Sequence, residues 1–285
     1  MTGTCRAACG VAAPYDLIMA AGTPIAVRRV GRGAPVLCLH ATGHGGRDFD
    51  AFTDLATPEG FEVVVVDWPG QGASPTDATG APADSVRYAA ILAELVSALF
   101  PEQKPIILGN SIGGMTALRY TTEYPDAVRA LVLADPGGLI PIDSPTRTEI
   151  GLMVRFFEAG ARGAFWYPAA FALYYSLVLP GRPARDQRAR IIAAATETAS
   201  VIRDAWKSFA RPDADLRKVL AALDVPVLFT WSRHDHVVSW RRSRAAVARA
   251  RSAQVQLFDG GHSAFLEAPG PFFEAFSRFA LGLGE

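Results

Sequence analysis

The sequence has 285 residues, half of them hydrophobic, which is enough for one large domain or for a domain with an insertion. Its 28 basic and 28 acidic side chains leave no net charge, so neither nucleic acid nor a membrane surface is expected as a partner. No apolar run approaches the roughly 18 residues of a membrane-spanning helix. Three cysteines, an odd number, fit a reducing compartment better than a disulfide framework, and we expect a cytoplasmic protein.

The first 13 residues are small and rich in alanine, and they lack the apolar segment of a signal peptide. We therefore expect a flexible tail over residues 1–13.

Strands and helices alternate through the next part of the chain. Short apolar runs predict strands, and amphipathic spacing predicts helices. We expect strands within 15–30 and at 35–39, 61–66, 106–110, 127–134, 225–231 and 255–258, with helices at 49–55, 84–100, 239–251 and 272–281. This alternation favours an α/β fold with a mostly parallel sheet that is covered by helices on both faces.

The alternation stops between residues 139 and 223, where only helical patterns occur. We expect this segment to form a helical cap inserted into a core made of residues 14–138 and 224–285. Aromatic residues gather within the segment, and they are expected to pack the cap and line an apolar pocket. The pocket candidates are Phe165, Trp166, Phe171 and Tyr174.

The sequence Gly109-Asn110-Ser111-Ile112-Gly113 follows an apolar strand and precedes a helical pattern. This strand–turn–helix context is that of a nucleophile elbow, in which a serine stands at the tip of a strained turn. Glycines flank the serine because Cβ atoms would collide there. The turn also directs the Ile112 amide at a developing oxyanion.

Serine needs an adjacent base to become a nucleophile at neutral pH. In a parallel sheet, reactive groups collect at the carboxyl ends of the strands. His262 follows the last predicted strand and Asp235 follows the strand before it, so Ser111, Asp235 and His262 stand in the chain order of one type of triad. Asp135 also ends a strand and is the alternative acid.

Several segments together resemble the alpha/beta-hydrolase fold family over residues 14–285. They are His40-Ala41-Thr42-Gly43, Asp67-Trp68-Pro69-Gly70-Gln71-Gly72-Ala73-Ser74, the Ser111 elbow, Asp235 after its strand, and Gly261-His262 followed by Glu267-Ala268-Pro269. The resemblance implies an eight-stranded sheet, a helical cap after the sixth strand, and an oxyanion hole formed by the amides of Ile112 and Thr42.

The sequence departs from the family pattern at Ala41, Ser232 and Ser239, where glycine, glycine and proline are usual, and none of these changes removes a catalytic group. A serine nucleophile argues against the haloalkane dehalogenases and epoxide hydrolases that the family also contains. His40 is expected to brace its loop. His44 lies in a glycine-rich loop, where it either contacts substrate or is merely exposed.

The sequence thus predicts a serine hydrolase of the carboxylesterase type, with a small hydrophobic ester as substrate and with no cofactor. No His/Cys/Asp cluster has the spacing of metal ligands, so no metal is expected. A carbon–carbon bond hydrolase of ring-cleavage products is an alternative, although Ser263 stands where that group usually carries Trp. A perhydrolase, a cofactor-free oxygenase and a non-catalytic small-molecule receptor are further alternatives on the same fold. The sequence leaves the oligomeric state open.

Overall fold

The computed structural model describes residues 14–284, and the predicted tail at 1–13 lies outside the described residues. Eight strands form one sheet in the order β1-β2-β4-β3-β5-β6-β7-β8. The strands are β1 Asp16–Ala20, β2 Thr23–Gly31, β3 Ala34–Leu39, β4 Phe61–Val66, β5 Ile106–Asn110, β6 Ala130–Ala134, β7 Val227–Ser232 and β8 Ala253–Phe258. Only β2 is antiparallel to its neighbours, β1 and β4, and all other pairs are parallel. The predicted α/β class with a mostly parallel sheet is therefore confirmed.

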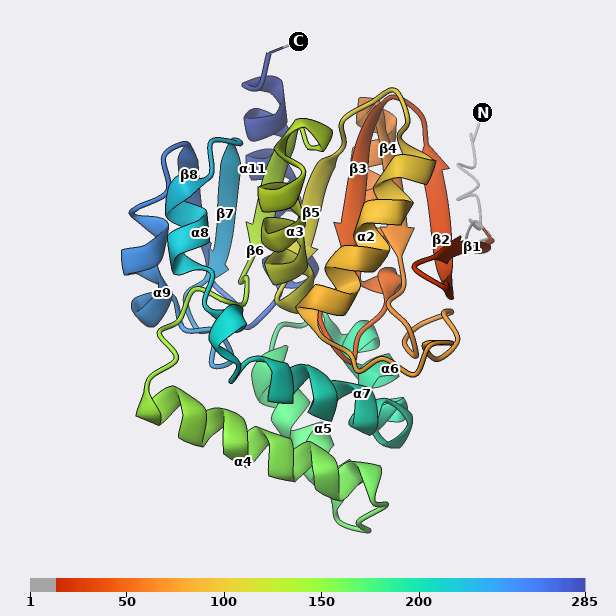
Figure 1. The fold of residues 1–285 in the computed structure, drawn as a ribbon, viewed down its shortest axis with the longest axis vertical. Helices are drawn as coiled ribbons and strands as arrows, with labels where there is room; N and C mark the ends of the chain where they lie inside the picture. Colours follow the sequence, from red (N-terminus) through yellow and green to blue (C-terminus); the bar gives the residue numbers. More distant parts are fainter. Residues whose placement is uncertain (1–13, 285) are drawn as a thin grey trace, which may run out of the picture.

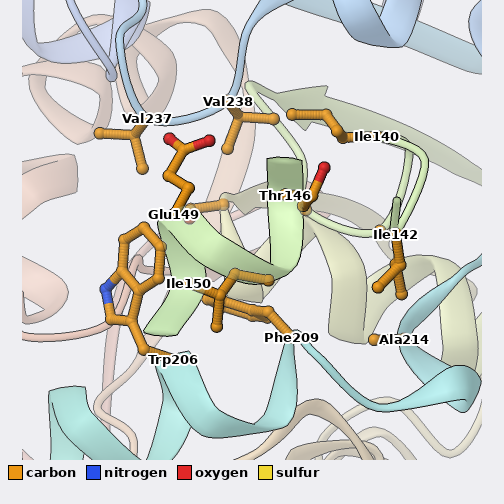
Figure 2. Close-up of a pocket in the computed structure, with 13 residues that line it drawn as sticks. Ile140, Ile142, Thr146, Glu149, Ile150, Trp206, Phe209, Ala214, Val237 and Val238 are labelled. Atoms are coloured by element: carbon orange, nitrogen blue, oxygen red, sulfur yellow. The ribbon is translucent and has the colours of Figure 1, made fainter. Parts of the chain in front are cut away.

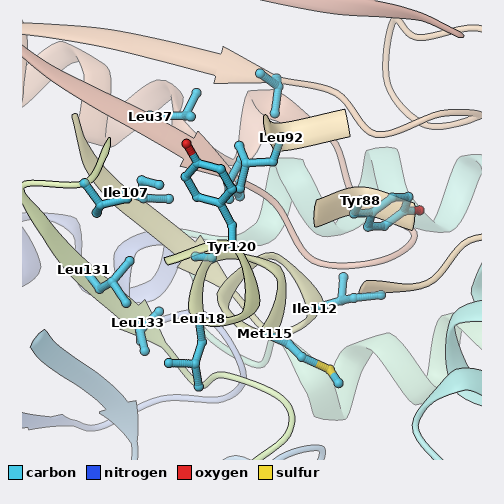
Figure 3. Packing of buried hydrophobic residues seen from close by; sticks show 14 of the residues in the cluster. Leu37, Tyr88, Leu92, Ile107, Ile112, Met115, Leu118, Tyr120, Leu131 and Leu133 are labelled. Carbon is cyan, nitrogen blue, oxygen red and sulfur yellow. The ribbon is translucent and has the colours of Figure 1, made fainter. Parts of the chain in front are cut away.

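Helices cover both faces of the sheet (Figure 1). The helices outside the 139–223 segment are α1 Asp50–Ala56, α2 Ser85–Leu99, α3 Ile112–Glu123, α9 Trp240–Val247, α10 Ala264–Glu267 and α11 Pro269–Leu281. Because successive side chains of a strand point to opposite faces, Leu37 and Leu39 join one buried cluster while Val36 and Cys38 join the other. Figure 3 shows strand residues Ile107 and Leu131 packing against Leu118 and Tyr120 of α3.

The chain between β6 and β7 is helical. It holds α4 Ser144–Ala161, α5 Tyr167–Val178, α6 Arg185–Ala193, α7 Ala195–Ser208 and α8 Arg217–Ala222. Figure 1 shows α4 to α7 beyond the carboxyl ends of the parallel strands, whereas α8 lies beside the sheet. Asp143 begins α4 by accepting a hydrogen bond from the amide of Thr146, as an N-cap residue does. None of the described helices is long and apolar enough to cross a membrane.

Several predicted element boundaries differ from the observed ones by a few residues. β6 begins at Ala130 because Pro125–Ala127 forms a short 3₁₀ turn before it. Helix α9 ends at Val247 and β8 begins at Ala253, both earlier in the chain than the sequence predicts. Arg249 and Arg251, which the sequence places at the end of a predicted helix, lie in the turn that joins α9 to β8.

Two glycines allow a matched test of how closely helix α3 approaches the sheet. A Cβ atom on Gly113 would lie 2.2 Å from the Leu39 carbonyl oxygen, whereas one on Gly151 of α4 would meet open space. Gly113→Ala should lower the free energy of unfolding by about 1–3 kcal/mol, because backbone must move. Gly151→Ala should raise it by about 0.5–1 kcal/mol, because glycine weakens an exposed helix. Urea denaturation measures both, and a change of the same sign in the two variants would contradict the prediction.

Candidate active site

Ser111 stands at a strained turn between β5 and α3. Its φ is 53°, in the region that side-chain-bearing residues rarely adopt, as the sequence predicts for an elbow. The turn is held by hydrogen bonds from the Ser111 amide to the Ala134 carbonyl (3.0 Å) and from the Gly137 amide to the Ser111 carbonyl (3.0 Å). A Cβ atom on Gly109 would lie 2.6 Å from the Gly113 carbonyl oxygen, so the turn requires glycine there. The main chain of Ser111 is therefore fixed by backbone packing.

His262 and Asp235 form a buried hydrogen-bonded pair at the same edge of the sheet. Nδ1 of His262 lies 2.8 Å from Oδ2 of Asp235. The other oxygen of Asp235 accepts hydrogen bonds from the amides of Val237 and Val238, at 2.7 and 3.0 Å. These bonds fix the carboxylate, which in turn fixes the imidazole so that Nε2 is the nitrogen left for chemistry.

The loop that carries His262 is tied to both the elbow and the helical segment. The His262 amide donates to the carbonyl of Val178 in α5 (2.8 Å), and its carbonyl accepts from the Asn110 side chain (3.1 Å). Ser263 donates from its hydroxyl to the Asn110 side-chain oxygen at 3.0 Å. Ser263 stands where carbon–carbon bond hydrolases usually carry Trp, and its hydrogen bond fixes the side chain of Asn110, the residue before Ser111.

Asp135 lies beside Asp235 rather than beside His262. It is completely buried, with φ at 45°, and its Oδ1 accepts from the amide of Ser232 (2.8 Å). Burial, together with the neighbouring charge of Asp235, raises the pKa of Asp135 well above its usual range. The raised pKa favours the protonated form of Asp135, whose Oδ2 has no hydrogen-bond partner within residues 14–284.

The loop after β3 is braced by His40 and Asp67. Nδ1 of His40 lies 2.7 Å from the Ala41 carbonyl, and its Nε2 accepts from the amide of Trp68 (3.0 Å). Burial lowers the pKa of His40, which suits a neutral ring that donates from one nitrogen and accepts at the other. His40 therefore braces the loop, as the sequence predicts. Asp67 accepts from the Gly46 and Ala73 amides.

This braced loop brings Thr42 to the wall of a cavity that Ser111 and His262 also line. Ile112, the other predicted oxyanion residue, is buried at the first position of α3, directly after Ser111. The Thr42 hydroxyl is buried and has no hydrogen-bond partner within residues 14–284.

His44 follows on the same loop and is buried rather than exposed. Its Nδ1 lies 2.6 Å from Oδ2 of Asp48, and Oδ1 of Asp48 accepts from the side chain of Gln187 in α6. The ring packs beside Tyr175 of α5, with ring centroids 5.6 Å apart. His44 lines the Ser111 cavity and also borders a more open cleft next to α6.

Two cavities meet at Ser111. The first, which we call the apolar arm, has a volume of about 80 Å³ and runs between α4 and the loop after β7 (Figure 2). Branched aliphatic and aromatic side chains form most of its wall, notably Ile140, Ile142, Ile150, Trp206, Phe209 and Val238, and Glu149 adds a carboxylate. The second, which we call the short arm, has about 30 Å³ and is lined by Thr42, His44, His262 and aromatic residues of α4, α5 and α7.

Three of the four predicted aromatic pocket residues do not line the cavities at Ser111. Phe165 is 96% exposed and Trp166 is 43% exposed, and Phe171 is completely buried among other aromatics of the helical segment. None of these three lines either arm, so the prediction is corrected for them, whereas Tyr174 lines the short arm. Helix α5 is apolar around most of its circumference, so its sequence pattern does not indicate which side faces the site.

Several residues that line the arms were not predicted from the sequence. Phe157 of α4 and Ile202, Trp206 and Phe209 at or after α7 line the short arm. Their helical spacing in the sequence was a usable signal of an apolar face directed at the site. The spacing of His44 and Asp48, four residues apart, was a second signal for the buried pair. Over residues 14–284, no three His, Cys, Asp or Glu side chains come together as metal ligands would.

A model of the alpha/beta hydrolase family matches residues 36–275. The chain belongs to the alpha/beta hydrolase family. The resemblance seen in the sequence is thereby confirmed, and the protein is an alpha/beta hydrolase enzyme.

Relatives within the family include esterases. The chain is 30% identical over 262 residues to a pimeloyl-[acyl-carrier protein] methyl ester esterase of Xanthomonas campestris pv. campestris, covering 89% of this chain and 98% of that protein. A thermophilic esterase from Thermogutta terrifontis has a similar fold, with a TM-score of 0.81, 23% identity and coverage of 96% and 100% of the two chains. An esterase from Exiguobacterium antarcticum gives a TM-score of 0.79 at 22% identity, covering 94% and 99%.

The raised pKa of Asp135 predicts how stability depends on pH. The folded protein keeps this proton where the unfolded chain has lost it, so stability falls as pH rises above about 4, the ordinary value for Asp. Asp135→Asn removes the titration and keeps a donor and an acceptor. Its free energy of unfolding, measured in urea at pH 5 and 8, should therefore fall less over this interval than that of the wild type. Asp126→Asn, at an exposed site, is the control and should follow the wild type. Equal slopes for wild type and Asp135→Asn would refute the prediction.

Proposed function

We propose that the protein is a serine carboxylesterase that uses Ser111, His262 and Asp235 and acts on small, largely apolar esters. The observation that carries the proposal is the convergence of the strained Ser111 and the Asp235-bound His262 on one cavity. The arrangement needs no cofactor, because each group that moves a proton or a bond belongs to the chain.

In the first half of the reaction, Oγ of Ser111 attacks the ester carbonyl carbon while Nε2 of His262 takes the hydroxyl proton. The amides of Ile112 and Thr42 stabilise the negative charge that develops on the carbonyl oxygen. The tetrahedral intermediate collapses, the alkoxide leaves with the proton from His262, and an acyl-enzyme remains.

In the second half, His262 takes a proton from water, which attacks the acyl carbon of the Ser111 ester. The collapse of the second intermediate returns the proton to Ser111 and releases the acid. Asp235 supports the imidazolium in both halves, and the amides of Val237 and Val238 hold its carboxylate in place.

The two arms give the substrate an orientation. His262 must protonate the leaving alkoxide, so the alcohol part of the ester lies beside His262, which lines the short arm. The acyl chain then enters the apolar arm, which holds about five to eight non-hydrogen atoms at roughly 10–15 Å³ each. Glu149 disfavours acyl chains that end in a negative charge.

The Xanthomonas relative supports a short alcohol part, since its name specifies a methyl ester. The acyl chain proposed here is neutral and apolar because the arm that receives it is lined by isoleucine, valine and aromatic side chains.

Ser111→Ala should lower kcat/KM for methyl hexanoate by at least about 10³-fold, because only binding and the oxyanion hole remain. Methanol release measures the rate, and labelling by a fluorophosphonate reports the nucleophile. Wild-type protein should be labelled at Ser111 and the variant should not. Retention of more than a tenth of the activity would rule out Ser111 as the nucleophile, and a wild type that neither turns over nor becomes labelled would favour a receptor.

Asp235→Asn should reduce kcat by orders of magnitude, about 10⁴-fold in the best-studied triad, because the imidazole then takes the wrong tautomer. Asp135→Asn is the matched comparison and should reduce kcat far less, because the raised pKa of Asp135 favours a carboxylic acid that an amide can replace. The reverse ranking of the two variants would make Asp135 the acid.

The apolar arm predicts a chain-length optimum. For methyl esters from butanoate upward, kcat/KM should rise by at most about fourfold per methylene until the arm is full, which makes selectivity tens-fold in total. Ile142→Phe narrows the arm and should shift the optimum to shorter chains. Leu152→Phe, at an exposed position of α4, is the control and should leave the optimum in place. A uniform drop across chain lengths in Ile142→Phe would show that Ile142 only supports the fold.

A further inference from the structure

His44 lies on the wall of the short arm but has no part in the proposed reaction of Ser111. It is buried and held by the buried carboxylate of Asp48, as His262 is held by Asp235. The cavity therefore contains a second imidazole–carboxylate pair. Hydrogen bonds already satisfy Nδ1 of His44 and both oxygens of Asp48, so the other ring nitrogen is the polar atom of the pair that is left for a ligand.

A chain of hydrogen bonds fixes the protons of this pair. Arg190 has no acceptor, so its Nε donates to Oε1 of Gln187 at 2.6 Å, which leaves the Gln187 amide nitrogen to donate to Oδ1 of Asp48. The other oxygen of Asp48 then accepts the Nδ1 proton of His44. When the ring carries a single proton, Nε2 is consequently an acceptor, and it faces open space rather than a hydrogen-bond partner within residues 14–284.

His44 borders two spaces, and the short arm is the one that also contains Ser111, so its size limits which substrate group can reach the ring. Its volume of about 30 Å³ accommodates about two to three non-hydrogen atoms, and the alcohol part of the ester occupies it. Two carbons with a terminal hydroxyl, which are three non-hydrogen atoms beyond the ester oxygen, have this size. The hydroxyl is a hydrogen-bond donor, which is what the fixed tautomer of His44 requires.

We propose that His44 is a specificity residue and that the preferred substrates are esters of short diols, whose free hydroxyl donates a hydrogen bond to Nε2. The inference rests on the proposed esterase function and on the assignment of the alcohol to the short arm. His44 exchanges no proton in the reaction, so it acts on the choice of ester.

The test uses two hexanoate esters whose alcohol parts have the same number of non-hydrogen atoms. The wild-type enzyme should hydrolyse 2-hydroxyethyl hexanoate with a kcat/KM more than about fivefold higher than propyl hexanoate, because the ester without the hydroxyl leaves Nε2 unpaired. In His44→Leu the ratio should fall to about one. A wild-type ratio below fivefold, or an unchanged ratio in His44→Leu, overturns the proposal, since a merely supporting residue would change both rates alike.

Asp48→Asn provides a second readout in a variant that keeps all its neighbours bonded. Gln187 still donates to the new amide oxygen, so the NH₂ group introduced at position 48 faces His44 and the ring proton moves to Nε2. The ring becomes a donor towards substrate. The kcat/KM ratio of cyanomethyl hexanoate, whose terminal nitrogen only accepts, to propyl hexanoate should rise at least about threefold over that of the wild type. A smaller rise overturns the proposal, and if His44→Leu fails to fold by circular dichroism, this variant decides alone.

Two controls separate His44 from its surroundings. Tyr175→Phe removes a neighbouring hydroxyl in the same arm and should keep the preference for the hydroxyethyl ester, as should His234→Gln at an exposed site. Loss of the preference in Tyr175→Phe with retention in His44→Leu would assign it to Tyr175 and overturn the proposal. Hydrolysis of all esters with no such preference refutes this inference alone, whereas absence of hydrolysis and of fluorophosphonate labelling refutes the esterase function with it.

Discussion

The close approach of α3 to the ends of β3 and β5 is the constraint on which the site depends. A positive φ at a serine is unfavourable by itself and persists only where the surroundings leave no alternative. Here Gly109 and Gly113 let the helix pack directly on backbone, and the Ala134 and Gly137 bonds hold both sides of Ser111. The hydroxyl therefore has a fixed place, and the rest of the site is arranged around it.

The parallel sheet explains why the sequence predicted so much of this site. Parallel strands end at one edge, so residues directly after β5, β7 and β8 converge even though they are far apart in the chain. Chain order and apolar runs therefore sufficed to select Ser111, Asp235 and His262 as one group, and the structure brings the last two into a hydrogen bond. They also sufficed for the loop brace at His40, whose position after β3 leaves it completely buried.

The helical segment between β6 and β7 was harder to predict, because its side chains are positioned by packing between helices rather than by a shared sheet. Phe165 is an aromatic residue of the kind that lines apolar pockets, but it precedes α5 and is exposed. Trp206 on α7, in contrast, lines the short arm. The different contacts of Asp135 and Asp235 could not be read from the sequence, for a similar reason. Both end buried strands, and only the three-dimensional contacts show that Asp135 meets a carboxylate and a backbone amide instead of an imidazole.

The amide of His262 is bonded to the Val178 carbonyl, and this one main-chain contact ties the base to the last residue of α5. Helix α5 also supplies Tyr174 and Tyr175 to the short arm. A displacement of α5 that widened the arm would break the bond at His262 and leave a buried amide unpaired. An alcohol bulky enough to displace α5 in this way would therefore also disturb the position of His262, the proposed base.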